Sequence, residues 1–393
     1  MNEAAQNAEH PIGVIDVLDH FAGATPELAR LRALRPELVE LEQRAYDVLF
    51  PPGPGAAADT GVSAAERAAA ALAVAVEHRS APAVRHYGTL LEAATGDTTT
   101  AERITARTPL NGDTATATAR RIAAAVAHAR LLTHTPAEGG PDAPRAAGFT
   151  DPQIVTLSQT VAFANHQMHL AAGLALLATG DSGTGTDPGA PSTTVSGGPR
   201  YTTDVLTWRP AIRPLAPEEL GEEHRAALAG KRRADTPYFR TLGHDLGILA
   251  VRTAIDLAAF TAEGGLPRAE RELAATAVSL YNGCVYCASV HARLTARLHG
   301  DPAPVHRFLA HGSTAVLGRR WKLIVRLAAG LAPVPATAAE ADVEALRAQG
   351  LTELALVDLV HCAAFFGWAN RLMLSLGSVA GETEEDDGRK ATG

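Results

Sequence analysis

Apolar residues recur along the chain mainly at the three- and four-residue spacing that places side chains on one side of a helix. The spacing is clearest in two alanine-rich segments, 64–78 and 268–281, and the same character returns at 314–331 and 352–376. Pro267 stands just before the second segment, where proline is compatible with a helix start. Runs of alternating apolar and polar residues are too short to indicate a sheet. The pattern therefore predicts an all-α protein.

Segments that can bury almost no apolar surface divide the predicted helices into two blocks. Residues 181–200 are mostly glycine, serine, threonine and proline, which is the composition of a flexible linker. The acidic stretch 381–393 is predicted to be a disordered tail, and 1–11 a loose leader. The blocks 12–180 and 201–380 are therefore predicted to be two helical domains of similar length.

The two blocks contain similar helices in the same order. Residues 61–76 resemble 265–280 at an offset of 204 residues, and residues 148–163 resemble 350–365 at an offset of 202. Two matches at nearly one offset favour a tandem repeat of one helical unit over chance similarity between alanine-rich helices.

Composition and charge narrow the choice of partners. Apolar residues make up 46 % of the chain and charged residues 20 %, as in globular proteins. The net charge of −8 gives no sign of a nucleic-acid-binding face, and the short basic run 230–233 is interpreted as a solvated loop. No stretch reaches the ~20 apolar residues that span a bilayer, and no secretory signal is evident. We therefore expect a cytoplasmic protein with neither a nucleic-acid nor a membrane partner.

The cysteines indicate where chemistry occurs. Cys284 and Cys287 form one C-x-x-C pair, whereas Cys362 stands alone and is interpreted as a core residue. A large chain with three cysteines does not use disulfides as scaffolding, so the pair indicates redox chemistry or metal binding. Structural zinc usually needs four ligands, and the sequence has no second pair. His166 and His169, one helical turn apart, are interpreted as helix-surface or interface histidines rather than metal ligands.

The residues around the pair predict a compact site. The dipeptide Asn-Gly before the first cysteine is a break signal, so a new helix is expected to begin near Cys284. Cys284, Cys287 and His291 would then line one stripe of that helix, whose N-terminus favours a thiolate. Glu272 lies on the preceding helix and can fold back to hold the imidazole in one tautomer. Such a set suits peroxide reduction, in which a thiolate attacks the peroxide and a second thiol resolves the sulfenic acid.

The complete pattern resembles the AhpD-like alkylhydroperoxidases of the carboxymuconolactone decarboxylase family. Their signature is a glutamate, eleven residues, and then C-x-x-C-x-x-x-H, and the sequence matches it at four positions: Glu272, Cys284, Cys287 and His291. The resemblance covers about 208–377. It implies an all-helical fold, an obligate homo-oligomer and disulfide-linked reduction of a hydroperoxide substrate. Together with the repeat, it predicts two tandem AhpD-like helical domains.

The resemblance also implies a role for each residue. Cys287 would form the sulfenic acid, and Cys284 would be the proton donor and resolving thiol. Glu272 and His291 would form the proton relay. Tyr286 departs from the pattern, because some of these peroxidases have histidine there. No haem, flavin or metal cofactor is implied, and the oxidised pair would be reduced by a lipoyl or thioredoxin-like dithiol.

The first block lacks this chemistry, although it resembles the same family more faintly. At the offset of 204, the four positions are occupied by Ala68, Ser80, Ala83 and Tyr87. We therefore expect a degenerate domain that packs on the second block and helps to wall its pocket.

Three functions stay open at this point. The leading one is thiol-dependent reduction of alkyl hydroperoxides. The second is decarboxylation or isomerisation of a biosynthetic intermediate, which needs a proton relay but no cysteine turnover. The third is a non-enzymatic dithiol redox sensor, which a test of turnover would separate from both enzymes.

Overall fold

The computed structural model describes residues 16–51, 60–110, 116–180 and 201–380. Within these ranges the chain forms nineteen α-helices and one two-stranded ribbon, so the predicted all-α fold class is confirmed. The predicted leader, linker and tail (1–11, 181–200 and 381–393) lie outside the described residues. Below, the N-terminal half means the described residues up to 180, and the C-terminal half means 201–380.

The N-terminal half is built around one long helix. That helix, α9, begins at a capping box in which Thr150 and Gln153 exchange side-chain-to-backbone hydrogen bonds, and α4 begins at an equivalent box of Ser63 and Glu66. The helices of this half are α1 (Val17–Ala22), α2 (Pro26–Arg32), α3 (Pro36–Leu49), α4 (Ala64–Glu77), α5 (Ala81–Thr95), α6 (Thr99–Thr105), α7 (Ala117–His134), α8 (Asp142–Ala146) and α9 (Asp151–Thr179).

The C-terminal half has the same plan with additions at its start. Its additional elements are a short antiparallel ribbon and three small helices: β1 (Trp208–Pro210), which pairs with β2 (Gly377–Val379), α10 (Glu222–Leu228), α11 (Lys231–Ala234) and α12 (Pro237–Leu242). The remaining helices are α13 (Leu246–Thr261), α14 (Arg268–Tyr281), α15 (Val285–His299), α16 (Ala303–His311), α17 (Arg319–Leu331), α18 (Glu340–Ala348) and α19 (Glu353–Ser375).

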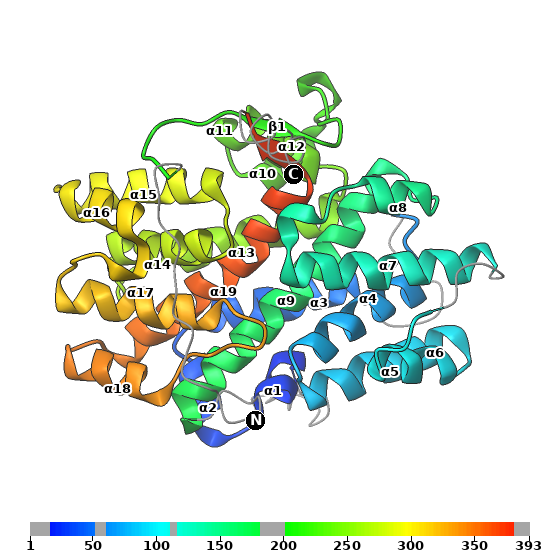
Figure 1. The fold of residues 1–393 in the computed structure, drawn as a ribbon, viewed down its shortest axis with the longest axis horizontal. Coiled ribbons are helices and arrows are strands. Elements are labelled where there is room, and N and C mark those ends of the chain that lie inside the picture. Colours follow the sequence, from blue (N-terminus) through cyan, green and yellow to red (C-terminus); the bar gives the residue numbers. More distant parts are fainter. Residues whose placement is uncertain (1–15, 52–59, 111–115, 181–200, 381–393) are drawn as a thin grey trace, which may run out of the picture.

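The helices of the two halves correspond in order, and two of the pairs are equal in length. Helices α4 and α14 both have 14 residues, and α5 and α15 both have 15. In each half the same neighbours pack together, since α5, α7 and α9 pack on α4 as α15, α17 and α19 pack on α14. Figure 1 shows α4–α8 on the right and α14–α18 on the left, with α9 and α19 between them. This arrangement agrees with the predicted repeat, whose domain boundaries stay a prediction.

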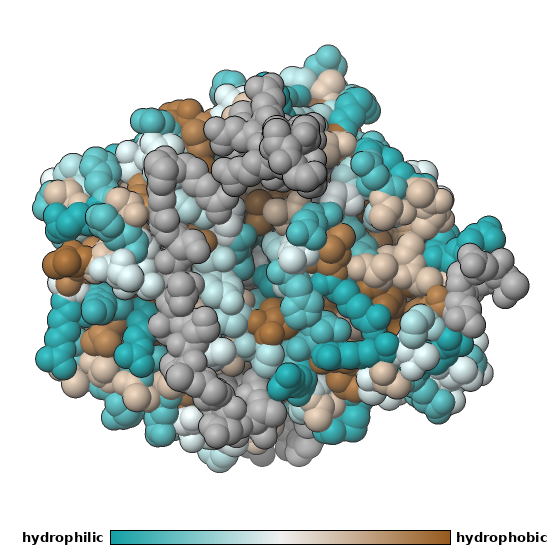
Figure 2. Space-filling view, in the orientation of Figure 1, coloured by the Kyte–Doolittle hydropathy of each residue, from teal (hydrophilic) through white to brown (hydrophobic). Residues whose placement is uncertain are grey.

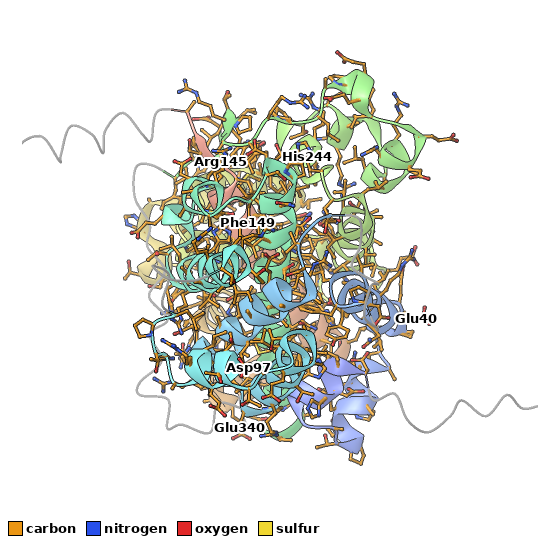
Figure 3. All side chains as sticks on the ribbon, turned by 90° about the vertical axis from the view of Figure 1, so that its right-hand side faces the viewer. Glu40, Asp97, Arg145, Phe149, His244 and Glu340 are labelled. Carbon is orange, nitrogen blue, oxygen red and sulfur yellow. The ribbon has the colours of Figure 1, made fainter. Side chains whose placement is uncertain are left out.

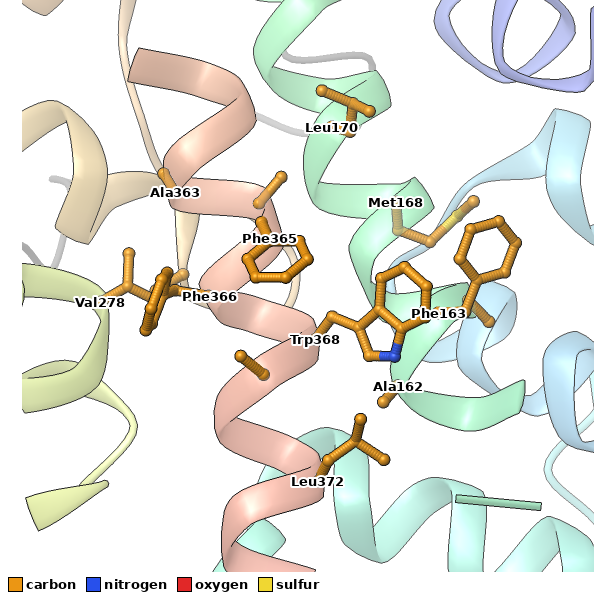
Figure 4. Close-up of a cluster of buried hydrophobic side chains, with 14 of the residues drawn as sticks. Ala162, Phe163, Met168, Leu170, Val278, Ala363, Phe365, Phe366, Trp368 and Leu372 are labelled. Atoms are coloured by element: carbon orange, nitrogen blue, oxygen red, sulfur yellow. The ribbon is translucent and has the colours of Figure 1, made fainter. Parts of the chain in front are cut away.

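Helices α9 and α19 pack against each other and join the two halves in one hydrophobic core. Trp368 of α19 lies at the centre of this contact, edge-on to Phe163 of α9 at 5.1 Å between ring centroids (Figure 4). Its indole Nε1 donates a hydrogen bond to the Oε1 of Gln159 at 2.9 Å. A buried tryptophan with its N–H satisfied contributes its full apolar surface to the core.

Polar contacts also tie the halves together. Arg35, at the start of α3, pairs with the buried carboxylate of Asp358 in α19 at 2.7 Å. Arg145 donates a hydrogen bond to the backbone oxygen of Ala211 at 2.9 Å. The Nε2 of His244 lies 2.8 Å from the backbone oxygen of Arg213, two residues further along the chain. Arg145 and His244 both lie near the top of the view in Figure 3. The segment before α10 is therefore held by side chains from both halves.

The predicted helices agree closely with the structure. Segments 64–78, 268–281 and 352–376 match α4, α14 and α19, whereas 314–331 begins five residues too early because α17 starts at Arg319. The solvated-loop interpretation of 230–233 is wrong, since 231–234 forms α11. None of the helices in the described ranges is both long and apolar enough to cross a bilayer. On the face shown in Figure 2, hydrophobic residues form separate small patches among hydrophilic ones.

Candidate active site

The dithiol segment lies at the turn between α14 and α15. Helix α14 ends at the Asn-Gly break, where Gly283 has φ 71°, a left-handed conformation that suits glycine. Cys284 is the N-cap of α15, and its backbone oxygen accepts from the N–H of Ala288 at 2.9 Å. Cys287 lies in the first turn of the same helix. The predicted helix start at the first cysteine is therefore confirmed.

Glu272 and His291 form a buried pair beside this turn. The Oε2 of Glu272 lies 2.5 Å from the Nδ1 of His291, and its Oε1 accepts from the Nε of Arg268 at 2.6 Å. The side chain of Glu272 has no exposed surface, and the ring of His291 packs edge-on against Phe366 at 4.3 Å. The contact that the sequence predicts between these two groups is confirmed.

Burial and pairing act in opposite directions on the two groups. Burial alone raises the pKa of Glu272, but the charges and hydrogen bonds of His291 and Arg268 outweigh it and leave that pKa below 4.5. Burial alone lowers the pKa of His291, but Glu272 outweighs it and leaves that pKa above 6.5. Both shifts favour the charged forms of the pair, an imidazolium and a carboxylate.

Both cysteines of the pair are buried thiols that are not joined in a disulfide. Cys284 is 1 % exposed and Cys287 is 4 % exposed. Burial raises the pKa of Cys287, yet hydrogen bonds from Cys284 and Asn370 and the positive charges of His291 and Arg252 bring it below the ordinary value of 9.0. A lowered pKa makes a thiol a better source of thiolate near neutral pH.

A cavity of about 350 Å³ opens onto this site. Cys287, His291 and Tyr286 line it, whereas Cys284 and Glu272 stand behind it. Much of the remaining wall is apolar, and includes Leu257, Phe260, Val290 and Phe366. Four arginines also contribute to the wall: Arg232, Arg233, Arg252 and Arg268.

The expectation that the N-terminal half helps to wall the pocket is wrong for this cavity. All of the described residues that line it fall within 229–373. The turn between α10 and α11 and helix α12 contribute to the wall. The N-terminal half instead supports the wall from behind, because α3 packs on α13 and α9 packs on α19.

Several lining residues were not identified from the sequence. Arg268 carries a recognisable signal, because an arginine four residues before a glutamate on a helix can form an ion pair. Arg233 belongs to the run interpreted as a loop, and its guanidinium pairs with Asp256 at 2.9 Å. Arg252 and Tyr238 carry no local signal, since their positions depend on how α12 and α13 pack.

The N-terminal half fills the corresponding space with aromatic rings. Tyr87 replaces His291, is fully buried, and places its hydroxyl 2.5 Å from Gln167. The ring of Tyr87 packs against Phe21 and Phe50 at 5.7 and 5.2 Å. Ser80 caps α5 as Cys284 caps α15, while the other two positions are the buried alanines 68 and 83.

The remaining candidate residues are structural. Cys362 is buried, with its Sγ 3.7 Å from the backbone oxygen of Ala259, so its interpretation as a core residue is confirmed. His166 and His169 are buried at the interface between α9 and α19, which agrees with the interface alternative and not with an exposed helix surface. His166 pairs with Glu42 at 2.9 Å, and His169 packs on His78. No group of three or more potential metal-binding side chains occurs in the described parts of the chain.

Comparison with known proteins places the site in a family. Residues 247–330 match the model of the carboxymuconolactone decarboxylase family, and this segment contains Glu272, both cysteines of the pair and His291. This segment of the C-terminal half is therefore similar to the carboxymuconolactone decarboxylase family. No curated protein matches the sequence significantly.

Two solved structures are similar to part of this chain. A peroxidase-related protein from Ralstonia eutropha JMP134, described as an alkylhydroperoxidase AhpD core, is 27 % identical, covers 40 % of this chain and 84 % of its own, and has a TM-score of 0.37. A peroxidase-related protein from Silicibacter sp. TM1040 is also 27 % identical, covers 35 % of this chain and 74 % of its own, and has a TM-score of 0.32.

Proposed function

We propose that the protein is a thiol-dependent peroxidase that reduces alkyl hydroperoxides through Cys284 and Cys287. One observation carries the proposal: the cysteine with the lowered pKa, Cys287, faces a largely apolar cavity beside the Glu272–His291 pair. A thiolate, a proton donor and space for an organic group are thereby brought together, as reduction of a hydroperoxide requires.

The first step oxidises one sulfur. The Cys287 thiolate attacks the terminal oxygen of the hydroperoxide, an S–O bond forms, and the O–O bond breaks. Sulfur loses two electrons and becomes a sulfenic acid, while the peroxide is reduced to an alkoxide. The alkoxide takes a proton from the His291 imidazolium, whose pKa is raised by Glu272, and leaves as the alcohol.

The second step joins Cys284 and Cys287 in a disulfide. The Cys284 thiol gives its proton to His291 and attacks the sulfenic sulfur, forming the disulfide. The departing hydroxide takes that proton and leaves as water. A lipoyl or thioredoxin-like dithiol then reduces the disulfide and returns two electrons and two protons. No metal or organic cofactor enters the sequence of steps.

The test is peroxide consumption with a dithiol reductant. Cys287→Ser is expected to abolish turnover, and Cys362→Ala serves as the matched control because it removes the third, buried cysteine outside the cavity. In Cys284→Ser, a dimedone-type probe is expected to trap Cys287 as the sulfenic acid. Labelling of Cys284 in Cys287→Ser, with Cys287 silent in the reciprocal variant, would reverse the two roles.

The family name supports a second candidate, a decarboxylase or isomerase that uses Glu272 and His291 as a proton relay. Such an enzyme would keep its activity in Cys287→Ser but lose it in His291→Asn. A dithiol sensor would form the disulfide stoichiometrically and show no turnover. Dependence of multiple turnovers on both cysteines therefore separates the proposed function from both alternatives.

A further inference from the structure

We propose that Arg252 is a carboxylate-binding subsite in the wall of the same cavity, so that the preferred substrate is an apolar hydroperoxide that also carries a carboxylate. The reaction of such a substrate rests on the peroxidase function proposed above. Binding of a carboxylate at Arg252 does not, and the two can be tested separately.

Arg252 is a buried cation without an anionic partner. Its side chain is 3 % exposed and lines the cavity from α13. One of its terminal nitrogens donates to the hydroxyl of Tyr238 at 3.3 Å, its Nε has no partner, and the described residues provide no carboxylate within salt-bridge distance. Burying an unpaired charge is costly, so a guanidinium in this position is poised to take an anion from outside.

The other arginines that contribute to the inner wall are already neutralised. Arg233 pairs with Asp256 at 2.9 Å, and Arg268 pairs with Glu272 at 2.5 Å. Arg232 is exposed at the margin. Arg252 is therefore the inner-wall arginine that has no carboxylate partner among the described residues, and it matches a ligand with a negative charge.

The N-terminal half shows how the same position is satisfied internally. Arg252 is the seventh residue of α13, and Glu42 is the seventh residue of the corresponding helix α3. Glu42 is buried too, but its carboxylate has a partner within the chain, His166, at 2.9 Å. Only the half that keeps the dithiol presents a buried charge to a cavity without a partner among the described residues.

The surroundings of Arg252 favour a carboxylate attached to an apolar body. The guanidinium lies over the rings of Phe365 and Trp368 at 5.0 and 5.9 Å, contacts that fix its plane. A planar guanidinium matches the two oxygens of a carboxylate. The hydroxyl oxygen of Tyr238 accepts the hydrogen bond from Arg252. The hydroxyl proton of Tyr238 is therefore available to donate a second hydrogen bond to the bound carboxylate. The cavity volume of about 350 Å³ is small for a ligand site and suits a substrate with a short alkyl chain.

A different role for Arg252 makes a different prediction. Its charge also helps to lower the pKa of Cys287, so it could serve only as a counter-ion to the thiolate. In that case removal of the charge would slow every hydroperoxide to the same degree. If Arg252 binds a carboxylate, removal of its charge must lower kcat/KM more for acids than for their neutral esters.

The decisive comparison is kcat/KM for a short alkanoic acid carrying a terminal hydroperoxide and for its methyl ester. The wild-type protein is expected to prefer the acid by about 10- to 100-fold, the size of one charge-assisted contact. Arg252→Met is expected to abolish that preference, and Arg252→Lys to retain part of it. Arg297→Met, on the exposed surface of α15 and outside the cavity, is the matched control for loss of one positive charge and should keep the preference.

Two outcomes would overturn the subsite: no preference for the acid in the wild type, or an equal loss for acid and ester in Arg252→Met. A binding measurement without turnover separates the subsite from the peroxidase. By calorimetry, hexanoate should bind the reduced wild type at least about tenfold more tightly than hexanol, and this difference should vanish in Arg252→Met. Tighter binding of hexanoate without peroxide consumption would refute only the peroxidase function. Peroxide consumption without tighter binding of hexanoate than of hexanol would refute only the subsite.

Discussion

Replacement of Glu272 by glutamine tests the proton relay with the smallest change of shape. The carboxylate is fully buried and contacts both His291 and Arg268, so the substitution keeps the volume but removes the one negative charge that both cations share. The pKa of His291 is expected to fall, because Glu272 is what raises it. The pKa of Cys287 is then expected to rise, because the charge of His291 helps to lower it.

Both changes act against catalysis. Fewer molecules hold the thiolate, and fewer hold the imidazolium that protonates the alkoxide. A positioned acid–base group typically contributes ~10²–10⁴ to a rate, so Glu272→Gln should lower kcat/KM for a hydroperoxide by that factor. At 1.36 kcal/mol for each factor of ten, the loss equals about 2.7–5.4 kcal/mol of transition-state stabilisation.

The assay is steady-state peroxide consumption, with circular dichroism to confirm folding. Glu270→Gln is the matched control, because Glu270 lies two residues away on α14, is buried, and pairs with Arg320 at 2.6 Å outside the cavity. A wild-type rate in folded Glu272→Gln would remove Glu272 from the mechanism. Equal slowing in Glu270→Gln would show that loss of a buried ion pair, and not loss of the relay, explains the effect.

The same variant should reveal the pair in the pH dependence of stability. The pKa of Glu272 is depressed, so its contribution is present above 4.5 and is lost as the pH falls through the folded-state value. The pKa of His291 is raised, so its contribution is present below 6.5 and is lost as the pH rises through the folded-state value. The difference in the free energy of unfolding between the wild type and Glu272→Gln should therefore be largest between pH 4.5 and pH 6.5.

Three further predictions concern the thiol and the joint between the halves. Peptide-resolved alkylation should give a midpoint for Cys287 below the ordinary 9.0, and a midpoint at or above that value would contradict the lowered pKa. Asp358→Asn should lower stability to urea by about 3–5 kcal/mol, because it leaves Arg35 and Arg271 without their shared carboxylate; a loss under ~1 kcal/mol would make the contact dispensable. Residues 200–393 alone should be poorly soluble or change oligomeric state, since the α9-facing side of α19 would be exposed, whereas a well-behaved and active fragment would show that the halves are independent.

The parts of the site that the sequence predicted correctly are local in the chain. Glu272 and His291 are 19 residues apart across a single turn, and the Asn-Gly break determines how the two helices meet. Likewise, the starts of α14 and α15 follow from Pro267 and Gly283, whose backbone preferences act over one or two residues. Short-range stereochemistry is sufficient for such predictions.

The parts that could not be predicted depend on packing between distant segments. Arg252 stands 35 residues before Cys287, on a helix with no motif, and reaches the cavity only because α13 lies against α19. The basic run 230–233 looked like a solvated loop because its charges are dense. Arg233 nevertheless has an acidic partner on α13, Asp256, which no pattern within the run reveals. The wrong prediction about the pocket wall has the same origin, since closure by the short helices before α13 leaves no local signature.

The N-terminal half shows how the positions that correspond to the site can be filled by residues without its chemistry. A buried polar site that loses a partner leaves either a void or an unsatisfied group, and both are costly. Here the position of the histidine is filled by Tyr87, whose hydroxyl is satisfied by Gln167, and Phe21 of α1 packs onto the ring. Helix α9 thus keeps a rigid support on one side while its other side receives Trp368 of α19. Because α19 also carries Phe365 and Phe366 into the cavity wall, the packing of the N-terminal half on α19 supports the geometry of the cavity.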